Sequence, residues 1–124
     1  MALKNEFSKD KPLLTTSVVA NMLGITPDRL RTYDAEKLIK THRIKTGEVQ
    51  KRLYSQYDVE WLQGLRILVK THKMSISSIK FLLQVLYKNP ELKLPSNEIG
   101  EVLVEMMQNP NFKAVVKNFD LQKL

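Results

Sequence analysis

The sequence predicts a mainly α-helical fold that combines a helix-turn-helix with a small β-hairpin and additional C-terminal helices. Three observations support this prediction. Two short helical segments, near residues 17–23 and 27–37, are separated by a tight break at Gly24. Residues 38–54 alternate basic and apolar side chains around a second glycine, a pattern that favours a hairpin. Later segments repeat apolar residues at helical spacing.

Each boundary of the helix pair carries its own local signal. Thr16 or Ser17 is expected to cap the first helix, because a hydroxyl at that position accepts a hydrogen bond from a backbone N–H. Gly24 is expected to end it, since glycine adopts the left-handed conformation without strain. Thr26 then caps the second helix, with Pro27 at its first position. In a helix-turn-helix, the second helix is the one that enters the DNA major groove.

The segment after the hairpin is expected to form two further helices. Ser55 and Asp58 resemble a capping box, with aspartate in place of glutamate, at the start of the third helix. Trp61 is expected at the edge of the apolar face of that helix. Ser75 is expected to cap a fourth helix, whose apolar residues recur at helical spacing.

Proline punctuates the C-terminal third of the chain. Pro90 and Pro95 bracket a short linker, and Ser96 is expected to begin a fifth helix that stops before Pro110. A last helix follows. Its apolar positions, which share one face, are Phe112, Val115, Val116 and Phe119.

Charge is concentrated beside the second helix. The chain has 124 residues, 43% of them hydrophobic, a net charge of +7 and a pI near 9.7, which favours one small domain with a polyanionic partner. From Lys37 to Arg52, six basic residues face one acidic residue, whereas the segment from Pro95 to Leu124 has a net charge of −1. A basic patch at this place indicates nucleic acid as the partner.

Several classes of protein are disfavoured. No cysteine is present, so we expect no disulfide and no thiolate metal site, and His42 and His72 have no neighbours at ligand spacing. We therefore expect no metal and no cofactor. There is no secretion signal and no apolar run long enough to span a membrane, which predicts a cytoplasmic, nucleoid-associated protein. No phosphate loop, activated nucleophile or metal-protease motif is present, so we expect no catalytic residues and no enzyme.

Residues 13–86 resemble the MerR family of winged helix-turn-helix transcription regulators. In that family the recognition helix reads Ser or Thr, two variable residues, Thr-Leu-Arg-Tyr-Tyr-Glu and a hydrophobic pair. The matching residues here are Thr26, Leu30, Arg31, Tyr33, Asp34, Leu38 and Ile39. The family wing ends in Tyr-Arg-x-Tyr-Ser followed by an acidic residue. The matching residues here are Arg52, Leu53, Tyr54, Ser55 and Asp58.

This sequence also departs from the family pattern. Arg29 stands where threonine is usual, Thr32 stands where the first of two tyrosines is usual, and the wing is longer. The long C-terminal helix that pairs two family members in a coiled coil is replaced by prolines and short helices. We therefore do not transfer that dimerisation mode, or the activation mechanism that depends on it, to this chain.

The expected DNA contacts lie on the second helix and the wing. Arg29 and Arg31 can bind phosphates or guanine edges bidentately. Tyr33 and Tyr54 can donate their hydroxyls to phosphates, with core packing as the alternative. Lysines of the wing can contact the minor groove, or they are simply solvated. The full expected set is Thr16, Thr26, Asp28, Arg29, Arg31, Tyr33, Arg43, Lys45, Lys51, Arg52 and Tyr54.

The sequence therefore predicts a sequence-specific regulator that binds double-stranded promoter DNA. The alternative is an excisionase-like architectural protein that bends DNA. An adaptor that has lost DNA binding is disfavoured by the arginines of the second helix. We expect a flexible N-terminus (1–12), a DNA-binding domain (13–86) and a short helical segment (87–124) for dimerisation or partner docking.

The candidate partners of the C-terminal segment are RNA polymerase, a polymerase-associated regulator, or a second copy bound through a nonstandard interface. Apolar residues suggest this docking role, and packing against the third and fourth helices is the alternative. The candidate partner-binding residues are Met106, Met107, Phe119, Leu121 and Leu124.

Overall fold

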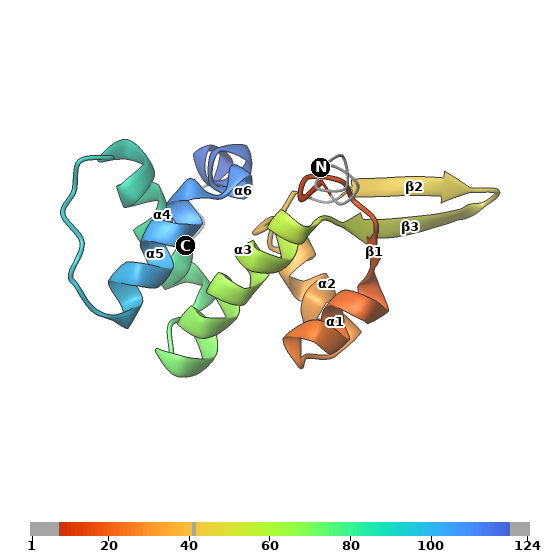
Figure 1. Ribbon diagram of the computed structural model, residues 1–124, viewed down its shortest axis with the longest axis horizontal. Helices are drawn as coiled ribbons and strands as arrows, with labels where there is room; N and C mark the ends of the chain where they lie inside the picture. The colour runs from red at the N-terminus through yellow and green to blue at the C-terminus, as the bar shows by residue number, and fades with distance from the viewer. Residues whose placement is uncertain (1–7, 41, 120–124) are drawn as a thin grey trace, which may run out of the picture.

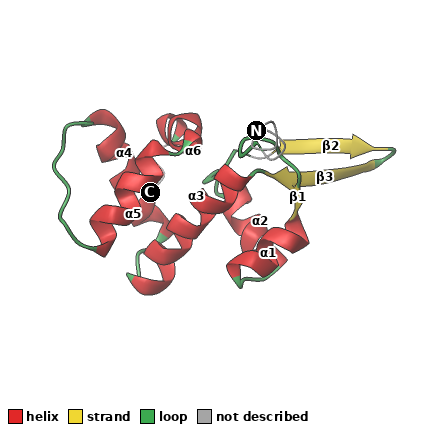
Figure 2. Ribbon diagram, viewed as in Figure 1, coloured by secondary structure: helices red, strands yellow, loops and turns green. Residues whose placement is uncertain are grey.

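The computed structural model describes residues 8–40 and 42–119. Figures 1 and 2 show a molecule whose long central helix, α3, lies between a helix pair with its hairpin and a group of C-terminal helices. The helices are α1 (Thr16–Leu23), α2 (Pro27–Ala35), α3 (Gln56–Arg66), α4 (Ile76–Lys88), α5 (Glu98–Gln108) and α6 (Pro110–Val115). A π-helical turn (Ile67–Thr71) extends α3, and a 3-10 turn (Val116–Asn118) extends α6. The strands are β1 (Leu14–Thr15), β2 (His42–Thr46) and β3 (Val49–Tyr54).

The helix-turn-helix forms largely as predicted. Gly24 ends α1 with φ 67°, and the Thr26 hydroxyl accepts a hydrogen bond from the Arg29 N–H at 3.1 Å, with Pro27 next in the chain. The cap of α1 is Thr15, not Thr16 or the serine after it. Thr15 pairs with β3, so its extended backbone already suits an N-cap. The second helix ends at Ala35, two residues before the predicted limit.

The predicted hairpin is confirmed: it is formed by β2 and β3 of an antiparallel sheet with the order β1-β3-β2, in which β3 is the central strand. Thr46 pairs with Val49 across a two-residue turn, in which Gly47 has φ 64°. A glycine with positive φ at the first turn position suits the twist of a hairpin. Strand β1 was not predicted, because two residues are too few to show a strand pattern. It joins Leu14 to Tyr54 and anchors the base of the hairpin, which we call the wing.

The central helix is buried on more than one side. The predicted capping box is confirmed, with reciprocal hydrogen bonds between Ser55 and Asp58. Trp61 is fully buried, so its expected place at the edge was wrong. Its indole N–H donates to the carbonyl of Leu38 at 2.6 Å, just after the helix pair. Trp61 is buried because both the helix pair and the C-terminal helices pack against α3.

The C-terminal helices pack on this core. Helix α5 begins after Asn97, which caps it in place of the expected Ser96. The side chain of Met106 lies so close to Gly64 that a Cβ there would approach its Cγ within 2.7 Å. Met106 is 2% exposed and Phe119 is 9% exposed. These two of the five expected partner-binding residues are therefore core residues, because the short helices fold back on α3 and α4.

A buried amide network joins the last helix to the rest of the chain. The Asn111 side-chain amide donates to Asp58 Oδ1 at 2.8 Å, and its Oδ1 accepts the backbone N–H of Lys40 at 3.2 Å. The neighbouring Asn109 donates from Nδ2 to the carbonyl of Tyr57 at 2.9 Å. Residues 109–111 thus bind both the start of α3 and the segment that leads into the wing.

The described part of the N-terminus also contacts α3. The backbone carbonyl of Lys9 accepts a hydrogen bond from the N–H of Tyr57 at 3.1 Å, and its ammonium group lies 2.7 Å from a carboxylate oxygen of Glu60. The rest of the expected flexible N-terminus lies outside the described residues. Within the described ranges, no helix is long and apolar enough to cross a membrane.

Candidate nucleic-acid interface

The outward face of α2 is polar and charged. Leu30 and Tyr33 face the core, which leaves Asp28, Arg29 and Arg31 exposed. Arg31 Nη1 lies 2.5 Å from Asp28 Oδ1, and the two side chains are 52% and 90% exposed. An exposed pair of this kind contributes little to stability. The two arginines therefore remain accessible to a partner.

The two tyrosines of the predicted site are core residues. Tyr33 is 2% exposed and Tyr54 is fully buried. Burial raises the pKa of both phenols; nearby Arg29 and Arg66 partly offset this for the pKa of Tyr33. The packing alternative applies here, so the structure corrects the expectation that the Tyr54 hydroxyl contacts phosphate.

The Tyr54 hydroxyl oxygen is buried and makes no hydrogen bond of normal geometry with a described residue. The half-buried Thr16 lies nearby and lowers the pKa of Tyr54. Burial raises this pKa by more, so the net shift is upward. Thr16, which was expected to contact DNA, is thus placed beside the base of the wing.

A carboxylate on α2 fixes the position of the wing. Asp34 Oδ2 lies 2.8 Å from Arg52 Nε and 3.1 Å from Arg43 Nη2. The two arginines are opposite each other in the strand register, and the Asp34 side chain is only 10% exposed. The sequence predicted that both arginines contact DNA, but it did not predict their ion pairs with Asp34. Because a guanidinium has five N–H donors, each arginine can hold Asp34 and still bind a phosphate.

The lysines of the wing lie on opposite faces. Lys45 is two residues from Arg43 along β2, so it shares the face that carries the two arginines and Asp34. Lys51 pairs with Ile44 in the register and therefore points to the other face. Both lysines are exposed. The sequence pattern grouped them together, but the strand register separates them.

Two cations beside the helix pair were missed. Arg66 and Lys70 line a pocket of about 400 Å³ together with Arg29, the turn at Gly24 and Tyr33. Arg66 Nη2 donates to the carbonyl of Gly24 at 3.4 Å, a long hydrogen bond. The sequence analysis considered only the apolar residues of this segment. The spacing of four residues between Arg66 and Lys70 could have indicated the pair, since it places both on one side of a helix.

The two histidines lie apart, and each is close to a different carboxylate. His42 Nε2 is 3.6 Å from Asp58 Oδ2, and His72 Nε2 is 2.8 Å from Glu98 Oε1. Among residues 8–40 and 42–119, no group of three or more His, Cys, Asp or Glu side chains is arranged to hold a metal ion.

Comparison with known proteins agrees with this geometry. The family model described as "MerR HTH family regulatory protein" matches residues 14–86, which is more than half of the chain. The chain belongs to this family of transcription regulators. The matched region includes the helix pair, the wing, α3 and most of α4. Helices α5 and α6 lie beyond it.

One curated relative is described as the putative heat shock protein HspR of Streptomyces coelicolor. It is 28% identical to this chain over 98 residues, which cover 79% of this chain and 63% of the relative. The alignment thus spans less than two thirds of that protein. No solved structure matches the chain.

Proposed function

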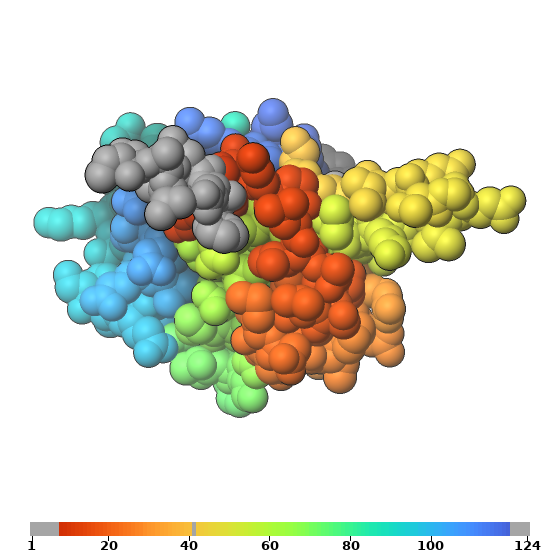
Figure 3. Space-filling model, turned by 45° about the vertical axis from the view of Figure 1, so that its right-hand side comes forward, coloured from red at the N-terminus to blue at the C-terminus, as the bar shows by residue number. Residues whose placement is uncertain are grey.

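We propose that this chain is a sequence-specific regulator that binds double-stranded promoter DNA through α2 and the wing. The observation that carries the proposal is the exposed cationic face of α2, tied through Asp34 to a basic wing. Figure 3 shows the wing projecting from the body next to α1 and α2, as an arm beside a duplex would have to do. Family membership supports this assignment.

In this proposal α2 lies in the major groove. An α-helix with its side chains is about 10–12 Å in diameter, which fits the width of about 12 Å that the major groove offers. Arg29, Arg31 and Asp28 contact base edges, because they are exposed on the helix itself. The Thr26 hydroxyl, already a cap, lies at the end of α2 where helix N–H groups favour a phosphate.

The wing supplies backbone contacts beside the groove. Arg43 and Lys45 lie on its arginine-bearing face, which we assign to the phosphates. Arg52 acts mainly as a positioning residue, since it is 30% exposed and bonds to Asp34. Arg66 and Lys70 extend the same positive surface past the turn of the helix pair. Such contacts supply affinity and orientation, whereas the base contacts supply sequence preference.

One recognition helix reads only a few base pairs, so useful specificity needs a second copy or a partner. We include in the proposal a homodimer through an interface other than the family's coiled coil. We also include control of transcription through RNA polymerase or a polymerase-associated protein. The order of the parts supports regulation over DNA bending, because the helices after Pro95 add surface that a bending protein does not need.

The test begins with selection of a duplex from a random pool, followed by fluorescence anisotropy on the selected duplex. Arg29→Ala and Arg31→Ala should each weaken binding by about 1–3 kcal/mol, because each removes a bidentate donor. Binding should also weaken steeply with salt, as counterions are released from the phosphates.

Lys93→Ala is the matched control, since it removes an exposed positive charge at the opposite end of the molecule. Equal affinity for wild type, both arginine variants and the control would rule out the proposed interface. A permutation assay on the selected duplex would separate the architectural alternative, which requires a strong bend.

A further inference from the structure

A groove lies at the end of the molecule opposite the wing. One wall is the loop of residues 89–97, and the other is the outer face of α5 (Figure 1). The groove has a volume of about 690 Å³. Its apolar lining includes Leu92, Leu94, Val104 and Met107. None of the contacts that build the DNA-binding surface uses this groove.

The walls of the groove are fixed by close contacts. A Cβ on Gly100 would lie 1.8 Å from the carbonyl oxygen of Pro95, so the loop and α5 meet with no space between them. The Asn97 side chain caps α5 at 2.9 Å. At the other end of the loop, Asn89 Nδ2 donates to the carbonyl of Val85 at 2.8 Å. The groove is therefore preformed, which lowers the entropy lost on binding.

Apolar side chains are exposed in this groove. Leu92 is 51% exposed and Val104 is 43% exposed, whereas Met107 is partly buried. An exposed apolar set with an adaptable methionine is typical of a surface that binds another protein.

The α5 side of the groove is acidic although the chain has a net charge of +7, whereas the loop of residues 89–97 carries one acidic residue, Glu91, and one basic residue, Lys93. Helix α5 has three glutamates and no lysine or arginine. Glu98 is paired with His72, but Glu101 and Glu105 are exposed and in no ion pair among the described residues. These two glutamates line the groove one helical turn apart, so their charges act on the same side.

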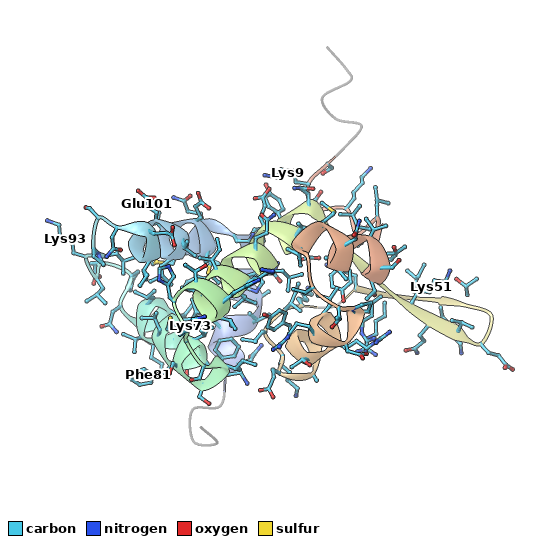
Figure 4. The ribbon with its side chains drawn as sticks, turned by 90° about the horizontal axis from the view of Figure 1, so that it is seen from below. Lys9, Lys51, Lys73, Phe81, Lys93 and Glu101 are labelled. Atoms are coloured by element: carbon cyan, nitrogen blue, oxygen red, sulfur yellow. The ribbon has the colours of Figure 1, made fainter. Side chains whose placement is uncertain are left out.

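We propose that this groove binds a basic amphipathic helix of a partner protein. The apolar residues of such a helix would enter between Leu92 and Val104, and its lysines or arginines would face Glu101 and Glu105. A helix laid in an apolar groove is a common recognition mode, and opposite charges at the rim set its partner and orientation. Figure 4 shows Glu101 at the far end from Lys51 of the wing, so DNA on α2 would leave the groove open.

The probe is a fluorescein-labelled peptide of leucine and lysine, roughly 14 residues long, which forms about four turns of amphipathic helix. Its twin has glutamate in place of every lysine. Anisotropy at physiological ionic strength, which screens attraction of the acidic twin to the exposed cations of α2 and the wing, should show tighter binding of the basic peptide than of the acidic twin. Glu101→Lys with Glu105→Lys should weaken binding of the basic peptide by at least roughly tenfold, and so should Val104→Asp.

Glu48→Lys is the matched control, because it reverses an exposed charge in the turn of the wing and should leave peptide binding unchanged. Amide shifts caused by the peptide should cluster at Leu92, Gly100 and Val104. Circular dichroism verifies that each variant is folded, and DNA affinity of Val104→Asp should equal that of wild type.

Three outcomes would overturn the proposal. The first is no binding of the basic peptide, or equal binding of both peptides. The second is unchanged binding in the groove variants, or shifts that cluster elsewhere. The third is a wild-type dimer in sedimentation that Val104→Asp dissociates, which would assign the groove to a second copy of the chain.

Discussion

The two ends of the molecule use polar side chains in opposite ways. At the wing end, the polar groups of α2 and the hairpin are mostly exposed. Asp34 there forms ion pairs with Arg43 and Arg52, whose side chains remain partly exposed. At the C-terminal end, amides are buried: Asn111 is 4% exposed, Asn109 is 8% exposed and Gln84 is 6% exposed. Gln84 donates to the carbonyl of Val116 at 3.2 Å, which ties α4 to the end of α6.

This difference separates two roles that look alike in the sequence. Exposed charges contribute little to stability but are free to bind, whereas buried amides contribute mainly to stability. Substitutions at the wing end should therefore change DNA affinity more than folding. Substitutions at the C-terminal amides should do the reverse.

The largest expected effect is on folding. Asn111→Ala should lower the free energy of unfolding by about 2–4 kcal/mol, because it removes the hydrogen bonds of Asn111 to Oδ1 of the buried Asp58 carboxylate and to the Lys40 N–H. Urea unfolding followed by the fluorescence of Trp61 measures this loss. Asn118→Ala is the control, since that exposed side chain makes one long hydrogen bond at 3.4 Å. A loss below about 1 kcal/mol for Asn111→Ala would show that the amide network is not structural.

The same experiment addresses the predicted division of the chain at residue 86. If residues 87–124 unfold separately, Trp61 fluorescence and circular dichroism should report different transitions. We expect one transition, because Asn109 and Asn111 hydrogen-bond to α3 and to the start of the wing segment. Two separated transitions would contradict that expectation.

The second prediction compares the two faces of the wing. Lys45→Ala should weaken DNA binding by roughly 1 kcal/mol and lower the salt slope by about one, because it removes one of the proposed phosphate contacts. Lys51→Ala should have less than half that effect, since its strand position points it to the other face. Anisotropy over a range of salt concentrations measures both. Equal effects of the two variants would show that strand register does not select the contacts.

Local signals made much of the fold predictable. The caps at Thr26, Ser55 and Ser75 were identified because a hydroxyl before an apolar helix has one common use. Gly24 and Gly47 were identified because glycine commonly ends a helix or forms a tight turn. The place of Trp61 was not, because its burial depends on helices more than 35 residues away that cover α3 from the other side.

The candidate site was predictable only as a set of exposed cations. Sequence reasoning found Arg29 and Arg31, since the helix motif itself defines which face is outward. It did not separate Lys45 from Lys51, because the register of a hairpin depends on the turn. It did not find that Asp34 holds Arg43 and Arg52, since ion pairs between distant segments leave no local pattern.

Met106 and Phe119 illustrate the same limit for the C-terminal segment. An apolar helical face looks identical whether it packs inside the chain or binds a partner. Only the fold shows that these two residues are buried, while Met107 lines the groove. Leu121 and Leu124 lie outside the described residues, so their proposed docking role stays a prediction. Deleting residues 120–124 and measuring reporter regulation would test it.

The smallest expected effect is that of Tyr54→Phe at neutral pH. The substitution removes a buried hydroxyl that has no partner of normal geometry, so stability at pH 7 should change by less than about 1 kcal/mol. DNA affinity should not change, because the hydroxyl is not exposed to a phosphate. A tenfold loss of affinity would show that the tyrosine reaches DNA after all.

The effect of Tyr54 on the free energy of unfolding should become measurable at high pH. Burial raises the pKa of Tyr54 above its value in the unfolded chain, so the folded state holds the phenolic proton more tightly. The stabilisation due to this difference is fully present below the unfolded pKa, near 10, and is lost as the pH rises through the higher folded pKa. Tyr54→Phe should therefore lose less stability than wild type between pH 9 and 11, as measured by urea midpoints. Because the pKa of Tyr33 is also raised by burial, the double substitution Tyr33→Phe with Tyr54→Phe should make stability still less dependent on pH in this range. Identical alkaline profiles for wild type and Tyr54→Phe would show that this phenol titrates as it does in the unfolded chain.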